Sequence, residues 1–192
     1  MTDPLATRPA DADSEAASDP RLAHTAHHEA AHAVVAVRLG IRLEYVSIAP
    51  EPAEHAGQDG ARGTVAELPT DEARGLVERL NRPGPFQAEA GDPMSVGDRV
   101  RFALAGPAAD RRHLGRSDIG GRGDLATAQW LRDRVGFSED EFARLEEYAE
   151  AMVERDWPAI EAVAQELLRV VRLSGEDVRG LVHPFALSAR PK

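Results

Sequence analysis

The sequence predicts a mainly α fold of the α+β type, with one small β-hairpin beside a histidine-containing helix. Apolar residues recur at helical spacing through most of the chain, and helix-capping signals divide this pattern into segments. Only two short stretches have the β-branched and aromatic content of strands. The length of 192 residues and the hydrophobic content of 42% allow one domain with a sizeable core.

This domain is expected to cover residues 19–185. Residues 1–18 are rich in Ala, Asp, Ser and Pro and contain one large aliphatic residue, Leu5, so they are expected to form a disordered N-terminal tail. Residues 186–192 are expected to form a short C-terminal tail.

The first expected helix runs from Pro20 to about Leu39. Asp19 is its expected N-cap, since an acidic residue before a proline is typical of a helix start. Gly40 is expected to end it, because glycine readily adopts the left-handed conformation that closes helices.

This helix contains a His-Glu-x-x-His motif formed by His28, Glu29 and His32. Positions i and i+4 lie on one face of a helix, so both imidazoles can reach one metal ion, with Glu29 placed to act on water activated by that ion. The apolar flanking residues 30–37 favour burial of this helix. Burying two histidines and a glutamate costs free energy, so a shared function such as metal binding would explain their presence in the core. The alternative is an amphipathic helix that merely contains two histidines.

The two expected strands are Leu43–Ala49 and Gly63–Leu68, joined by the long polar loop of residues 50–62. In a peptidase, an extended substrate can add to the edge of such a hairpin through main-chain hydrogen bonds. A hairpin that only supports the domain explains the pattern equally well.

Capping signals and periodicity predict the remaining helices. Thr70 is an expected N-cap, Ser138 and Glu141 have the spacing of a capping box, and Asp156 comes two residues before a proline. The expected helices cover, in order, residues 70–80, 95–115, 124–136, 138–155, 156–173 and a last short segment from about 175.

A catalytic zinc site needs three protein ligands and an open fourth position, so one ligand lies outside the motif. A metzincin is excluded, because Val35 and Arg38 occupy the positions where that class has Gly and His. Glu51 and Glu54 are weak candidates in a proline-containing loop. Asp124 follows a glycine-rich turn at an expected helix start and is better placed, although an ordinary N-cap role explains it equally well.

The segments HHEAAHAVVA, SIAP, RFALAGPAADRRHLG and GGRGDLATA together resemble the zinc-peptidase domain of FtsH-type ATP-dependent proteases. The resemblance extends over about residues 24–182. It implies a Zn²⁺ cofactor held by His28, His32 and Asp124, with Glu29 as the catalytic base. Of the other histidines, His24 is expected to face solvent or to lie behind the metal ligands.

The sequence departs from this family in three ways. Ala31 stands where members usually have glycine, the loop of residues 50–62 is longer than usual, and the family's membrane segment and ATPase module are not found in these 192 residues. The chain therefore resembles a peptidase domain that stands alone.

The expected function is a zinc-dependent endopeptidase that hydrolyses unfolded or short polypeptides without an ATPase of its own. A separate unfoldase could supply its substrates, and a homo-oligomer is compatible with the sequence. The alternatives are a non-proteolytic metal-binding domain that binds a protein partner, and a hydrolase of small amides.

Composition excludes several other classes. The net charge is −10 and the basic residues are dispersed, so nucleic acid is a poor candidate partner. The absence of cysteine rules out disulfides and thiolate ligands. No apolar run approaches the roughly 18 residues that span a bilayer, so we expect no membrane segment and a cytoplasmic location.

Overall fold

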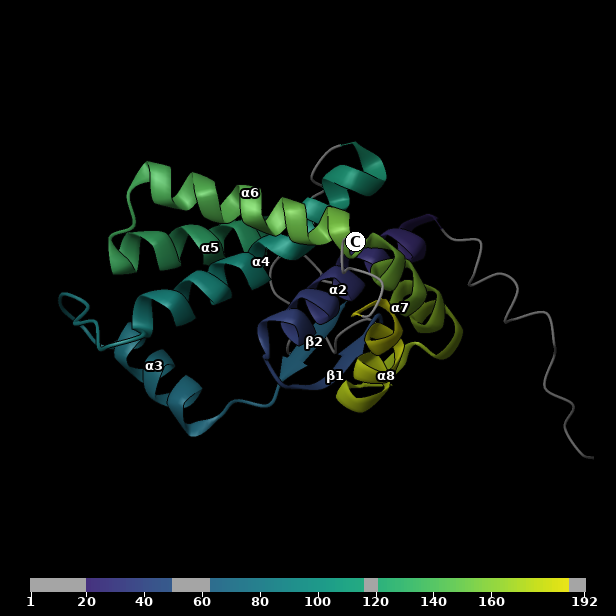
Figure 1. The fold of residues 1–192 in the computed structure, drawn as a ribbon, viewed down its shortest axis with the longest axis horizontal. Coiled ribbons are helices and arrows are strands. Elements are labelled where there is room, and N and C mark those ends of the chain that lie inside the picture. Colours follow the sequence, from purple (N-terminus) through teal and green to yellow (C-terminus); the bar gives the residue numbers. More distant parts are fainter. Residues whose placement is uncertain (1–19, 50–62, 116–120, 187–192) are drawn as a thin grey trace, which may run out of the picture.

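The structure is a computed structural model that describes residues 20–49, 63–115 and 121–186. Helices dominate these residues, and three short strands accompany them (Figure 1). In chain order the elements are α2 (Pro20–Leu39), β1 (Leu43–Ser47), β2 (Thr64–Glu67), α3 (Asp71–Asn81), α4 (Asp92–Leu114), α5 (Arg122–Val135), α6 (Glu139–Arg155), α7 (Trp157–Val170), β3 (Arg172–Ser174) and α8 (Gly175–Ala186). The predicted mainly helical α+β fold is confirmed.

Helix α2 is the central element. In Figure 1 it lies between α4, with α5 and α6 beyond it, and the pair α7 and α8. Five of its alanines are fully buried, and small side chains let neighbouring helices approach closely. These alanines are Ala26, Ala30, Ala31, Ala33 and Ala36. The motif helix therefore runs through the core, as its apolar flanks predict.

The apolar core consists of two clusters. The first combines α2, the sheet, the C-terminal end of α6, α7 and α8 with the C-terminal half of α4, around residues such as Val34, Ile48 and Ile160. The second combines α3, α5, α6 and the N-terminal half of α4, around Leu104 and Leu131. Because α4 contributes to both clusters, it connects the two parts of the domain.

The sheet has the strand order β2-β1-β3, and both pairs are antiparallel. Val46 in the central strand β1 pairs with Val65 of β2 on one side and Leu173 of β3 on the other. The hairpin of β1 and β2 is the predicted one. Strand β2 is an outer strand of the sheet formed by the described residues.

Strand β3 corrects the prediction that a helix continues through Leu173. Helix α7 ends at Val170 because Val171 adopts a left-handed conformation with φ of 67°, and its N–H donates to the Leu167 carbonyl at 2.7 Å. The chain then pairs with β1 over Arg172–Ser174, which buries the Leu173 side chain.

Two helix starts also differ from the prediction. Helix α4 begins at Asp92 rather than about Ser95, because the buried Asp92 carboxylate accepts hydrogen bonds from Glu89 N–H at 2.7 Å and from Arg79 at 2.6 Å. Helix α5 begins at Arg122.

Several local signals act as predicted. Thr70 caps α3 by accepting a hydrogen bond from Ala73 N–H, Ser138 and Glu141 form the capping box of α6, and Gly40 ends α2 with φ of 74°. Asp156 occupies the N-cap position of α7 but makes no capping bond with its side chain. Its buried carboxylate instead accepts two hydrogen bonds from Arg38, at 2.8 and 3.0 Å.

Other predictions concern residues outside the described ranges: the N-cap Asp19, the tail of residues 1–18, the loop of residues 50–62 and most of the C-terminal tail. Helix α8 ends at Ala186, one residue past the expected domain boundary.

Among the described helices, none combines the length and apolar character needed to cross a bilayer.

Candidate metal centre

The motif side chains lie on the buried part of α2. His28, Glu29 and His32 are only 7%, 8% and 5% exposed. Imidazoles and carboxylates rarely enter a core without partners, because burying an unpaired polar group costs free energy. Their surroundings must therefore supply those partners.

Asp124 completes a group of three converging ligand atoms. Its Oδ2 lies 3.0 Å from His28 Nε2 and 3.3 Å from His32 Nε2, and the two Nε2 atoms lie 3.3 Å apart. Two ligand atoms bonded tetrahedrally at about 2.0–2.1 Å to one Zn²⁺ ion lie about 3.3 Å apart. The three atoms therefore outline one face of a coordination tetrahedron, and this buried His/Asp group can hold a metal ion.

The structure places Asp124 in the first turn of α5, two residues after Arg122, so it is not the N-cap. Its side chain, 30% exposed, points toward the two imidazoles instead. Burial alone would raise the pKa of the Asp124 carboxyl, but His32 and His28 outweigh burial and hold that pKa well below its usual range. The carboxylate is thus ionised, as a metal ligand must be. Glu51 and Glu54 lie outside the described residues.

Gly106 of α4 makes room for this group, and sequence reasoning did not identify it. A Cβ atom at position 106 would lie well under 3.0 Å from Nε2 of both His28 and His32. Any larger residue would therefore displace both imidazoles. The available signal was a glycine within the otherwise apolar helical run ALAGPAA, a position that often reflects close packing.

A second glycine makes room for Glu29. Gly63 immediately precedes β2, and a Cβ atom there would overlap the Glu29 carboxylate. The backbone at the start of β2 thus lies directly against this side chain. Burial raises the pKa of Glu29, although His32 and His28 oppose the increase, so the carboxylate is a better proton acceptor than an exposed glutamate.

The Nδ1 atoms of the two imidazoles, which are not part of the three-atom group, have different hydrogen-bond partners. His32 Nδ1 donates to the Phe102 carbonyl at 2.7 Å, whereas His28 Nδ1 donates to the carboxylate of Asp110 at 3.0 Å. Burial alone would lower the pKa of His28, but the hydrogen bonds to Asp110 and Asp124 and the charge of Glu29 raise it to about 10. The acidic surroundings of His28 therefore stabilise a positive charge on or next to its imidazole.

Fold and site together define a mainly helical domain with a buried His/Asp group that can bind a metal ion. The chain matches no protein-family model and no curated protein.

Proposed function

We propose that this protein is a zinc-dependent endopeptidase that hydrolyses unfolded or short polypeptides. The observation that carries the proposal is the position of Glu29, which is buried between the three-ligand group and the start of an outer β-strand. A metal site that only stabilises the fold needs the ligands alone. It needs neither an adjacent carboxylate nor a glycine that makes room for it.

Two imidazoles and one carboxylate form the ligand set of catalytic zinc sites that keep an open fourth position. His28, His32 and Asp124 would hold the Zn²⁺ ion, which would supply polarisation of the substrate carbonyl and acidification of water. Glu29 would take the proton from the attacking water and deliver it to the nitrogen of the leaving amine. Burial raises the pKa of Glu29, which supports the first of these steps, because a raised pKa favours acceptance of the proton.

The outer strand supports a polypeptide substrate over a small amide. An extended peptide that pairs with β2 through main-chain hydrogen bonds would pass Glu29 at the Gly63 end of the strand. The other end of the strand borders a cavity of about 820 Å³, which Glu67 and Leu68 line together with α3 and the start of α4. A chain of several residues could therefore occupy this path.

The test is hydrolysis of a disordered protein such as casein by the zinc-loaded protein and by its Glu29→Gln variant. The variant retains the size of the side chain but cannot accept a proton, so we expect unchanged zinc affinity and a rate lower by about 10²–10⁴-fold. Equal rates for the two proteins at equal zinc content would refute the proposed mechanism.

Two further outcomes would favour the alternatives. If fully zinc-loaded protein cleaves no polypeptide but binds one, the domain is a non-proteolytic binding module. If it hydrolyses only short amides, it is a small-amide hydrolase. Asp124→Ala serves as the control for metal dependence, because it should lose both zinc and activity.

A further inference from the structure

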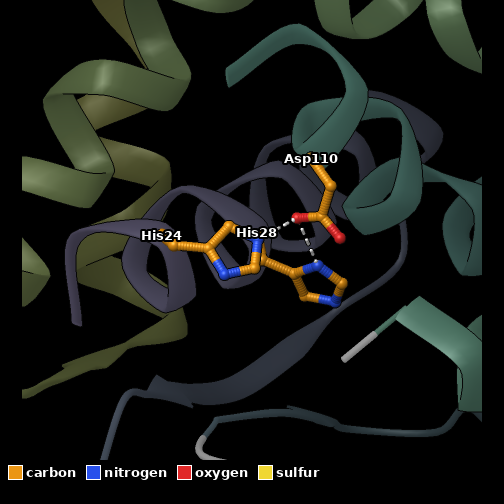
Figure 2. A group of neighbouring side chains, drawn as sticks. All are labelled: His24, His28 and Asp110. Carbon is orange, nitrogen blue, oxygen red and sulfur yellow. Dashed lines mark hydrogen bonds and ion pairs between the residues drawn. The ribbon is translucent and has the colours of Figure 1, made fainter. Parts of the chain in front are cut away.

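A buried carboxylate lies behind the metal-binding group. Asp110, on α4, is 1% exposed, and its Oδ1 accepts hydrogen bonds from His24 Nε2 at 2.7 Å and from His28 Nδ1 at 3.0 Å. Figure 2 shows both bonds converging on this one oxygen, with the two imidazoles coming from α2. The proposed function assigns no role to Asp110 or His24.

These three residues could be a second metal site, since their ligand atoms lie close together. The distance between His24 Nε2 and Asp110 Oδ1 argues for a hydrogen bond instead. At 2.7 Å it is well below the separation of about 3.3 Å expected between two ligands of one tetrahedral zinc ion, and it is typical of a strong charge-assisted hydrogen bond. His28 can then use Nε2 for the metal and keep the proton on Nδ1.

We propose that Asp110, held by His24, is a positioning residue that fixes the His28 imidazole with Nδ1–H as donor and Nε2 as metal ligand. This inference rests on the metal centre of the proposed function. A histidine ligand whose second nitrogen donates to a carboxylate is oriented in one tautomer and binds metal more strongly.

Charge balance supports this role. An isolated buried carboxylate is costly, and both partners of Oδ1 are imidazoles rather than a permanent cation. A divalent ion bound by two neutral imidazoles and Asp124 would retain one positive charge. That charge would offset part of the negative charge of the two buried carboxylates near His28, Glu29 and Asp110.

His24 adds a second hydrogen bond to the Asp110 carboxylate. It lies one helical turn before His28, so α2 presents both imidazoles to the same oxygen of α4. The second hydrogen bond restrains the carboxylate from turning away from His28. His32 has no such pair behind it, because its Nδ1 donates to the neutral Phe102 carbonyl. The two motif histidines are therefore held differently.

The first experiment compares zinc affinities at fixed pH by competition with a chromogenic chelator. We expect Asp110→Asn and Asp110→Ala to bind zinc about 10–100-fold more weakly than wild type, and His24→Gln to show a smaller loss, because His24 acts only through Asp110. Asp156→Asn, which removes a different buried carboxylate, is the control and should keep wild-type affinity. Unchanged affinity in both Asp110 variants would overturn the inference.

The second experiment follows the Nδ1 protons of the zinc-loaded protein by ¹H–¹⁵N NMR. In Asp110→Ala, the His28 Nδ1 proton should exchange with water faster than in wild type. The His32 Nδ1 proton, bonded to Phe102, should remain protected and shows that the fold around the site is intact. Equal protection of the His28 proton in both proteins would contradict a positioning role.

Metal stoichiometry separates failure of this inference from failure of the proposed function. If His28→Ala binds zinc as tightly as wild type, the proposed metal centre itself is wrong. If wild type binds one zinc through His28 and the Asp110 variants match it, only the positioning role fails. If wild type binds a second zinc that is lost in His24→Gln, the cluster is a metal site, which also overturns the inference.

Discussion

Single residues determine how much space surrounds the side chains of His28, Glu29 and His32. Gly106 and Gly63 each lie where one methyl group would collide with a site residue, the first with both imidazoles and the second with Glu29. Gly97, on the same helix as Gly106, would meet only ordinary contacts of 3.5 Å or more. The two glycines of α4 therefore form a matched pair for testing the geometry.

Gly106→Ala should weaken zinc binding by about 100-fold or more, because displaced imidazoles no longer converge with Asp124 on one ion. Gly97→Ala should leave zinc affinity unchanged, and both variants should retain helical content by circular dichroism. Chelator competition is the measurement. Wild-type affinity in Gly106→Ala would show that the imidazoles do not lie where the structure places them.

At the scale of one element, α6 illustrates how a helix start depends on local bonds. The Ser138 hydroxyl accepts from Glu141 N–H at 3.3 Å, and the Glu141 carboxylate accepts from Ser138 N–H at 2.9 Å. The backbone hydrogen bond from Ser138, followed by its hydroxyl, holds the pKa of Glu141 below its usual value. The stability that this capping box gives to the helix therefore depends on pH.

Ser138→Ala should destabilise the protein by about 0.5–2 kcal/mol, as expected for loss of an N-cap hydroxyl. It should also raise the pKa of Glu141 toward its usual value. Because the folded-state pKa is depressed, the contribution of Glu141 is present above its unfolded pKa of about 4.3 and disappears as pH falls through the folded pKa.

Urea unfolding at several pH values and NMR titration of Glu141 measure these two effects. Ser95→Ala is the control, since Ser95 is an exposed residue within α4. An unchanged pKa of Glu141 in Ser138→Ala would mean that the hydroxyl does not contribute to the shift.

At the scale of the whole molecule, the group of His28, His32 and Asp124 joins the two parts of the core. His28 and His32 belong to α2, which packs in the first cluster, whereas Asp124 lies in the first turn of α5, which contributes Ala128 and Leu131 to the second. A bound metal would therefore connect these parts directly. Its removal should affect the stability of the entire domain.

Addition of a chelator such as EDTA should lower the melting temperature. A ligand present at about 1,000 times its Kd stabilises the native state by about 4.1 kcal/mol. For a domain of this size this corresponds to about 8–16 °C. Differential scanning calorimetry with and without EDTA measures the shift, and Asp124→Ala should show little response. Equal melting temperatures for zinc-loaded and EDTA-treated wild type would indicate that no metal stabilises the fold.

The sequence by itself determined the features that depend on neighbours within one or two helical turns. These include the placement of His28, Glu29 and His32 on one helix and the caps at Thr70 and Ser138. Each rests on spacing or on a hydrogen bond over three or four residues, so the pattern of residue types is sufficient to predict it.

Only the tertiary structure decided the features that join distant segments. The candidate metal site brings His28 and Asp124 together across 96 residues, and Asp110 reaches His28 across 82. From spacing alone, Asp124 could be either an N-cap or a metal ligand. No local pattern indicated Asp110 or the strand formed by Arg172–Ser174, and the glycine in the apolar run around position 106 did not show what packs against it. These contacts depend on how the helices pack around α2, and many sequences with the same local signals could place other residues there.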